Sequence, residues 1–293
     1  MRVPETRYVS VGNADVAYQI VGEGPPDLLL FEGLSHSEMQ WTYDPSAEYR
    51  WQLASVTRLI SFDPRGMGAS ERVPMTDLAT WEEWTDDISA VLDATESEQT
   101  AIFAATDGGP AAILFAAMHP ERVTNLIVMN TSARFSLADD YPIGIAPGTI
   151  AGLVDFFRTA WGTPELARAI AGETDDDEYV RFVSQWLRAT ATPKGAAEHF
   201  RYVFEEFDVR QALPLVQAPT LILHNRGNGV IPISHAEYLR DHIAGARLVE
   251  LPFDGVGVPP QERHHVVDEV IEFVTGTCPP THLDPGTDDG SLH

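Results

Sequence analysis

Cysteine and lysine are almost absent from this 293-residue chain. Cys278 is the single cysteine, so no disulfide can form within the chain, and a reducing compartment such as the cytoplasm is expected. Lys194 is the one lysine among 19 basic residues. The chain also has 44 acidic residues, so its formal net charge is −25. So negative a surface repels nucleic acids and anionic membranes, and we expect neither as a partner.

Long apolar segments are absent as well. The first thirty residues carry charges throughout, unlike a secretory signal peptide, and the longest apolar runs are too short for a membrane helix. Hydrophobic residues nevertheless make up 44% of the chain, which is enough for one large core. We therefore expect a cytoplasmic monomer or homodimer.

Short apolar segments alternate with helical patterns along most of the chain. The opening segments Tyr8–Val11 and Asp15–Val21 read as an antiparallel hairpin around Gly12. Later strands are predicted at Asp27–Phe31, Arg58–Phe62, Gln99–Ala105, Asn125–Met129, Pro219–His224 and Arg247–Leu251. Helices between and after them predict an α/β fold, with a mostly parallel central sheet covered on both faces.

A block without strand patterns interrupts this alternation. From Ala146 to Phe207 only helical patterns occur, and such an insertion typically covers the strand ends, where α/β sheets bind ligands. The interpretation divides the chain into a core of residues 1–135 and 208–275, a helical lid at 136–207 and a flexible tail, rich in Pro, Gly, Thr and Asp, at 276–293.

The stretch from Gln99 to Met118 has the layout of a strand, a sharp turn and a buried helix. Thr106-Asp107-Gly108-Gly109 forms the turn, and Pro110–Met118 is apolar nearly all round. Small residues on both sides allow the backbone to bend sharply, so that the residue at the apex faces a pocket. We therefore predict a nucleophile elbow at this turn.

Four segments resemble the α/β-hydrolase superfamily, in the order in which that family carries them. They are DPRGMGAS at 63–70, GGPAAILFAAMHPERV at 108–123, DVRQALPLVQAPTLILH at 208–224 and GARLVELP at 245–252. The chain is most similar to α/β-hydrolase domains found beside bacterial adenylate cyclase domains. The resemblance spans about residues 8–275 and implies an α/β-hydrolase fold, whose usual machinery is a Ser-His-Asp triad.

All three triad positions implied by the resemblance hold other residues. Thr106 stands at the nucleophile position, Asn228 at the acid position and Val256 at the histidine position. A threonine without an imidazole in reach is a weak nucleophile, so we expect generic p-nitrophenyl esters not to be turned over. His264 or His265 is the alternative source of an imidazole, although both fall where the closing helix begins.

Asp107 directly follows the predicted apex. In an alternative register Asp107 is itself the apex, as in a dehalogenase-like or epoxide-hydrolase-like nucleophile, but the uninterrupted match from Gly108 onwards favours Thr106. In both registers the carboxylate lies at a helix N-terminus, which favours its ionised form. A capping aspartate is the alternative interpretation to a catalytic one.

Glu32 precedes Gly33 and Leu34, where the resemblance implies the second oxyanion-binding amide. A carboxylate here faces the pocket, and the nearby Asp107 raises the pKa of at least one of the two acids. We therefore predict Glu32 as the general acid and Asp107 as the base or charge stabiliser. Glu32 would also repel an oxyanion, which argues against ester hydrolysis. The alternative interpretation is an ion pair with an arginine such as Arg65.

The remaining candidate residues come from the loop after Phe31, from the helical block and from the last strand. With the catalytic candidates Asp107, Glu32, Thr106 and Asn228, the predicted oxyanion and substrate-binding residues are Gly33, Leu34, His36, Trp161, Trp186, His199, Tyr202 and Phe253. No set of His, Cys, Asp or Glu shows metal-ligand spacing and no dinucleotide fingerprint is present, so we predict neither a metal nor a cofactor.

Three functions fit these residues. The favoured one is a cofactor-free enzyme that catalyses cyclisation, C–C bond formation, isomerisation or epoxide opening on an apolar small molecule, in natural-product biosynthesis. The alternatives are an ester or epoxide hydrolase with Thr106 or Asp107 as nucleophile, and a small-ligand binding protein without catalysis. Paired carboxylates favour an enzyme, because burying charge without a use is costly.

Overall fold

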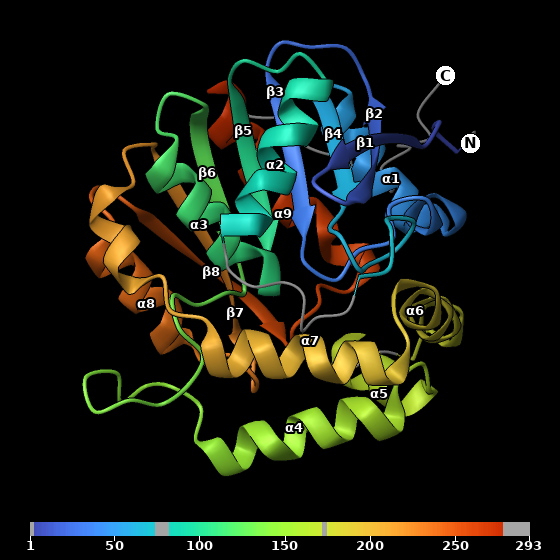
Figure 1. The fold of residues 1–293 in the computed structure, drawn as a ribbon, viewed down its shortest axis with the longest axis vertical. Coiled ribbons are helices and arrows are strands. Elements are labelled where there is room, and N and C mark those ends of the chain that lie inside the picture. Colours follow the sequence, from blue (N-terminus) through green and yellow to red (C-terminus); the bar gives the residue numbers. More distant parts are fainter. Residues whose placement is uncertain (1–2, 74–81, 172–174, 278–293) are drawn as a thin grey trace, which may run out of the picture.

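A single eight-stranded sheet organises the structure, a computed structural model that describes residues 3–73, 82–171 and 175–277. Its strand order is β1-β2-β4-β3-β5-β6-β7-β8 (Figure 1). The strands are β1 (Arg7–Val11), β2 (Ala14–Val21), β3 (Asp27–Glu32), β4 (Arg58–Asp63), β5 (Thr100–Ala105), β6 (Val123–Met129), β7 (Thr220–Gly227) and β8 (Arg247–Asp254). Cys278 and nearly all of the predicted tail lie outside the described residues.

Only the first strands of the sheet are antiparallel. β1 pairs with β2 through a turn at Gly12, which has a φ of +63° that glycine adopts without strain, and β2 pairs antiparallel with β4. From β4 onwards every neighbouring pair is parallel. The predicted mostly parallel sheet is confirmed.

Helices cover both faces of the sheet because its central strands are apolar on both. Along β3, Leu28 and Leu30 belong to one core cluster and Leu29 and Phe31 to the other. The first cluster packs against α1 (Asp44–Ala54) and α9 (Arg263–Thr275). The second packs against α2 (Glu82–Ala94), α3 (Gly109–Met118) and α8 (Ile233–His242). The predicted α/β class, a mostly parallel sheet with helices on both faces, is thereby confirmed.

Four further helices separate β6 from β7 and lie below the sheet in Figure 1. They are α4 (Pro147–Ala160), α5 (Pro164–Ala171), α6 (Asp177–Thr190) and α7 (Pro193–Glu206). Of the described helices, none is long and apolar enough to cross a bilayer. The division into a core and a lid at residues 136–207 stays a prediction.

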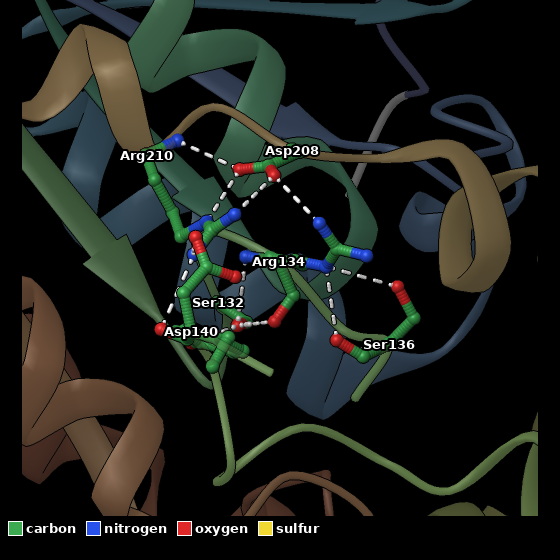
Figure 2. Close-up of polar contacts among 7 residues, drawn as sticks. Ser132, Arg134, Ser136, Asp140, Asp208 and Arg210 are labelled. Carbon is green, nitrogen blue, oxygen red and sulfur yellow. Dashed lines mark hydrogen bonds and ion pairs between the residues drawn. The ribbon is translucent and has the colours of Figure 1, made fainter. Parts of the chain in front are cut away.

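Charged residues tie together the two ends of this four-helix segment (Figure 2). Arg134 and Asp208 form an antiparallel bridge, and the Arg134 Nη1 donates to the Asp208 Oδ2 at 2.8 Å. Arg210 donates to the same oxygen at 2.8 Å, and its Nη1 lies 2.9 Å from the Asp140 Oδ2. The chain therefore leaves and re-enters the sheet layer at one fixed point.

Candidate active site

The turn after β5 has the geometry of a nucleophile elbow, with Thr106 at its apex. Thr106 has a φ of +49°, which is strained for a β-branched residue, whereas Asp107, in the same short helical turn Thr106–Gly108, is not among the residues with positive φ. The Thr131 Oγ1 donates to the Thr106 carbonyl at 2.5 Å and holds the strained peptide. Thr106 is therefore the apex, and the register with Asp107 at the apex is wrong.

Asp107 joins the Thr106 hydroxyl to a histidine from α7. The Thr106 Oγ1 donates to the Asp107 Oδ1 at 2.8 Å, and the His199 Nε2 lies 2.5 Å from the Asp107 Oδ2. His199 is fully buried, and its ring stacks on Trp84 at a centroid distance of 5.5 Å. Hydroxyl, carboxylate and imidazole thus form one line of hydrogen bonds, which the sequence interpretation did not foresee.

Gly33 allows this line to pass close to the β3 backbone. A Cβ atom at Gly33 would lie 2.3 Å from the Asp107 Oδ2 and 2.8 Å from the Gly108 nitrogen. Real Cβ atoms do not approach other atoms so closely, so any side chain here would displace the Asp107 carboxylate. The glycine before Leu34 is thus required for the position of Asp107.

Glu32 pairs with Arg50, and its predicted alternative pairing with Arg65 is wrong. The Arg50 Nη2 lies 2.9 Å from the Glu32 Oε2, while Arg65 forms a buried ion pair with Asp87. Arg50 is 3% exposed, and this burial lowers the pKa of its guanidinium. Because a guanidinium compensates Glu32, the predicted general-acid role of this residue loses its physical basis.

The Thr106 turn borders an apolar cavity of about 350 Å³. Its charged and polar residues lie at the ends of β3, β5 and β6, in the short helical turn Met39–Thr42, and on α1 and α9. They are Glu32, Gln40, Tyr49, Arg50, Thr106, Asp107, Asn130 and Arg263. Aromatic side chains of α4, α6 and α7 supply much of the remaining wall, namely Phe156, Phe157, Trp161, Tyr179, Phe182, Trp186, Phe200 and Phe204. Such a lining accepts an apolar small molecule.

The two other triad positions have structural roles. The Asn228 Oδ1 accepts hydrogen bonds from the amides of Val230 and Ile231, and Asn228 does not line the cavity, which argues against its predicted catalytic role. Val256 does line the cavity, and its carbonyl accepts a hydrogen bond from the Asn130 Nδ2 at 2.8 Å. Among the residues that the structure describes, Val256 takes the place where the family carries its histidine.

The other predicted residues divide into two groups. Leu34, Trp161 and Trp186 line the cavity, and the Trp161 indole also donates to the carbonyls of Leu187 and Ala191. Gly33 adjoins Asp107 without lining the cavity. The remaining ones do not line it either, and their substrate-binding roles stay predictions: His36, His199, Tyr202 and Phe253. Their side chains were predicted from sequence neighbourhood alone, which does not fix the direction of a side chain.

His264 and His265 lie outside the cavity, so neither replaces the missing triad histidine. Together with Glu262 they bring three possible metal-ligand atoms within 4.8 Å of one another at the start of α9. The sequence interpretation missed this group because Glu262 was not considered. The absence of a metal or cofactor stays a prediction.

The family model for the alpha/beta hydrolase fold matches residues 28–255. The chain belongs to this family. An alpha/beta hydrolase of similar sequence is the serine hydrolase BPHL of Mus musculus, 26% identical over 250 residues that cover 83% of this chain and 77% of the relative. Another is the putative carbamate hydrolase RutD of Caulobacter sp. (strain K31), 25% identical over 281 residues, or 90% of this chain and 98% of the relative.

Solved alpha/beta hydrolase structures share this fold. The esterase EaEST of Exiguobacterium antarcticum superposes with a TM-score of 0.79 at 19% identity and covers 92% of this chain and 98% of its own. The enol-lactonase of Burkholderia xenovorans LB400 gives a TM-score of 0.73 at 22% identity, over 92% and 100% of the two chains. At such identities the likeness shows the fold alone.

Proposed function

We propose that the protein is a hydrolase of apolar esters in which Thr106 is the nucleophile and Asp107 accepts its proton. The observation that carries the proposal is the 2.8 Å hydrogen bond from the Thr106 Oγ1 to the Asp107 Oδ1, at the apex of the elbow and at the edge of the cavity. The 2.5 Å contact of His199 with the other carboxylate oxygen fixes the orientation of Asp107.

The chemistry follows from this line of groups. The Thr106 Oγ1 bonds to the ester carbonyl carbon while its proton moves to Asp107, and the negative charge moves from the carboxylate to the carbonyl oxygen. Collapse of this intermediate expels the alkoxide, which takes the proton back from Asp107. Water then attacks the acyl-threonine with Asp107 as base, and the Thr106 hydroxyl re-forms when the acid leaves.

The charges around the turn are compatible with an oxyanion. In this fold the oxyanion donors are the amide after the nucleophile and an amide of the loop after the first buried strand, here Asp107 and Leu34. Glu32 would oppose an oxyanion if it were uncompensated, but Arg50 lies 2.9 Å from it. The objection to ester hydrolysis that Glu32 raised therefore weakens.

The non-hydrolytic reaction favoured by the sequence has less support than this hydrolase alternative. The similar proteins named above are described as hydrolases, and the Glu32–Arg50 pair removes the basis for Glu32 as a general acid. A place in natural-product biosynthesis, a link to adenylate cyclase domains, a cytoplasmic location and a monomer or homodimer stay predictions.

Hydrolysis of p-nitrophenyl octanoate tests this function. The wild-type protein should release p-nitrophenolate above the buffer rate, contrary to the expectation from the altered triad alone, and Thr106→Val should fall to the buffer rate because the hydroxyl is gone. Thr159→Val is the matched control, since Thr159 is exposed on α4 and away from the cavity. Equal rates in the wild type and Thr106→Val would refute the proposal, as would no hydrolysis in either.

A further inference from the structure

Two arginines border the same end of the cavity. Arg50 on α1 and Arg263 on α9 both line it, and each guanidinium carbon lies 5.9 Å from the centroid of the Tyr49 ring. The described carboxylates that line the cavity are Glu32 and Asp107. Asp107 contacts His199, and Glu32 forms an ion pair with Arg50. Neither of these two carboxylates is therefore available to neutralise the positive charge of Arg263.

Neutral groups alone hold Arg263 in place. Its Nη1 donates to the Ser46 Oγ at 2.8 Å and its Nη2 donates to the Tyr179 hydroxyl at 3.1 Å. Among the described residues no carboxylate lies within ion-pair distance of this guanidinium. A partly buried cation on an apolar cavity is costly unless an anion joins it.

Arg50 has an unsatisfied donor at the same place. Its Nη2 pairs with Glu32, but its Nε is buried and has no hydrogen-bond partner among the described residues. Its Nη1 reaches the Gln40 Oε1 only at 3.5 Å. Buried donors are normally satisfied, so the Arg50 guanidinium is incompletely bonded by the protein, and Arg50 lines the cavity.

We propose that the substrate carries one carboxylate group, in addition to the ester that is cut, and that Arg263 and Arg50 bind it. The proposal rests on the hydrolase function above and names its substrate class: an apolar ester with an acidic end. The two guanidinium groups carry two positive charges and Glu32 carries one negative charge, so one positive charge remains for a monoanionic carboxylate. The planar guanidinium of arginine can also donate two parallel hydrogen bonds to a carboxylate.

The two arginines are local positive charges on a strongly acidic protein. With a net charge of −25 the protein repels anions over most of its surface, so an acidic substrate needs local cations to be retained. Tyr49 and Tyr179 support the site by contacts of their rings with the Arg263 guanidinium, at 5.9 and 5.5 Å.

Isothermal titration with decanoate, decanol and decyl phosphate tests the proposal without turnover. Decanoate should bind more tightly than decanol, and Arg263→Gln should weaken decanoate about tenfold or more while decanol binding stays unchanged. Glu32→Gln should strengthen decanoate binding, because it adds one net positive charge. Arg226→Gln is the matched control, since Arg226 is exposed and remote from the cavity.

The outcomes separate this proposal from the hydrolase function. Thr106→Val should bind decanoate like the wild type, so binding can succeed even if ester hydrolysis fails. Equal binding of decanoate and decanol, or an Arg263→Gln variant with unchanged decanoate affinity, would overturn the anion site. Decyl phosphate binding as tightly as decanoate would overturn the assignment of the head group to a carboxylate.

Discussion

The Nε2 atom of His199 lies 2.5 Å from the Oδ2 atom of Asp107, although the two residues are 92 positions apart in the chain. The imidazole comes from α7, which belongs to the four-helix segment, and the carboxylate comes from the turn after β5. This contact therefore couples the position of that segment to the geometry of the Thr106 turn.

Asp107→Asn should lower ester hydrolysis by about 10²–10⁴-fold, because loss of a proton-transfer group has effects of that order. His199→Gln should lower it less, since His199 acts through the orientation of Asp107. The double variant should be no slower than Asp107→Asn, because residues that act as one unit are not additive. Steady-state kinetics of the three variants measure this, and additive losses would show that His199 acts independently of Asp107.

Gly33→Ala should impair turnover while the protein stays folded. The added Cβ would lie 2.3 Å from the Asp107 Oδ2 and push the carboxylate away from the Thr106 hydroxyl. Gly152→Ala is the control, because Gly152 lies in α4 with open space around it and should gain roughly 0.5–1 kcal/mol of helix stability. Kinetics with thermal unfolding tests the pair, and a fully active Gly33→Ala would contradict the close packing at the turn.

The sheet and the sharp turn at Thr106 could be predicted from the sequence because the patterns that indicate them are local. Apolar strands, small residues at 104–109 and a buried helix suffice to place Thr106 at a sharp apex. The ion-pair partners of Glu32 and Asp107 could not be predicted from the sequence. Arg50 and His199 reach these carboxylates through the packing of helices, which no local pattern encodes. Arg65 looked equally suitable for Glu32, but Asp87 on α2 binds it.

Acid should destabilise the fold through His235, a buried histidine near Ser132 and Tyr141. Burial lowers the pKa of His235 to about 4, from 6.5 in the unfolded chain, so its contribution is complete above pH 6.5 and declines as the pH falls towards 4. The free energy of unfolding should drop by up to about 1.4 kcal/mol per pH unit over this window.

Urea unfolding at pH 7 and pH 5 measures this effect. His235→Gln should reduce the pH slope, whereas His242→Gln, on the exposed end of α8, should leave it unchanged. A residual slope from His224 is expected, because burial lowers its pKa too. An unaltered slope in His235→Gln would show that its protonation is not linked to unfolding.

Asp208→Asn should destabilise the protein by about 1–2 kcal/mol, because Asp208 accepts hydrogen bonds from Arg134 and Arg210 and its loss leaves two guanidinium groups facing each other. These arginines hold the pKa of Asp208 below its usual range, so the contribution is present at neutral pH and is lost in acid. Asp241→Asn, which breaks an exposed pair with Arg240, should change nothing measurable. Equal urea midpoints for the two variants at pH 7 would contradict a structural role for Asp208.

Acid quenching during turnover of p-nitrophenyl octanoate, followed by peptide mass spectrometry, tests the central claim most directly. The account predicts an octanoyl group on Thr106 in the wild type and none in Thr106→Val, because the acyl-threonine is stable in acid while its hydrolysis needs Asp107 as base. An octanoyl group on Asp107, or steady hydrolysis without any adduct on Thr106, would contradict it.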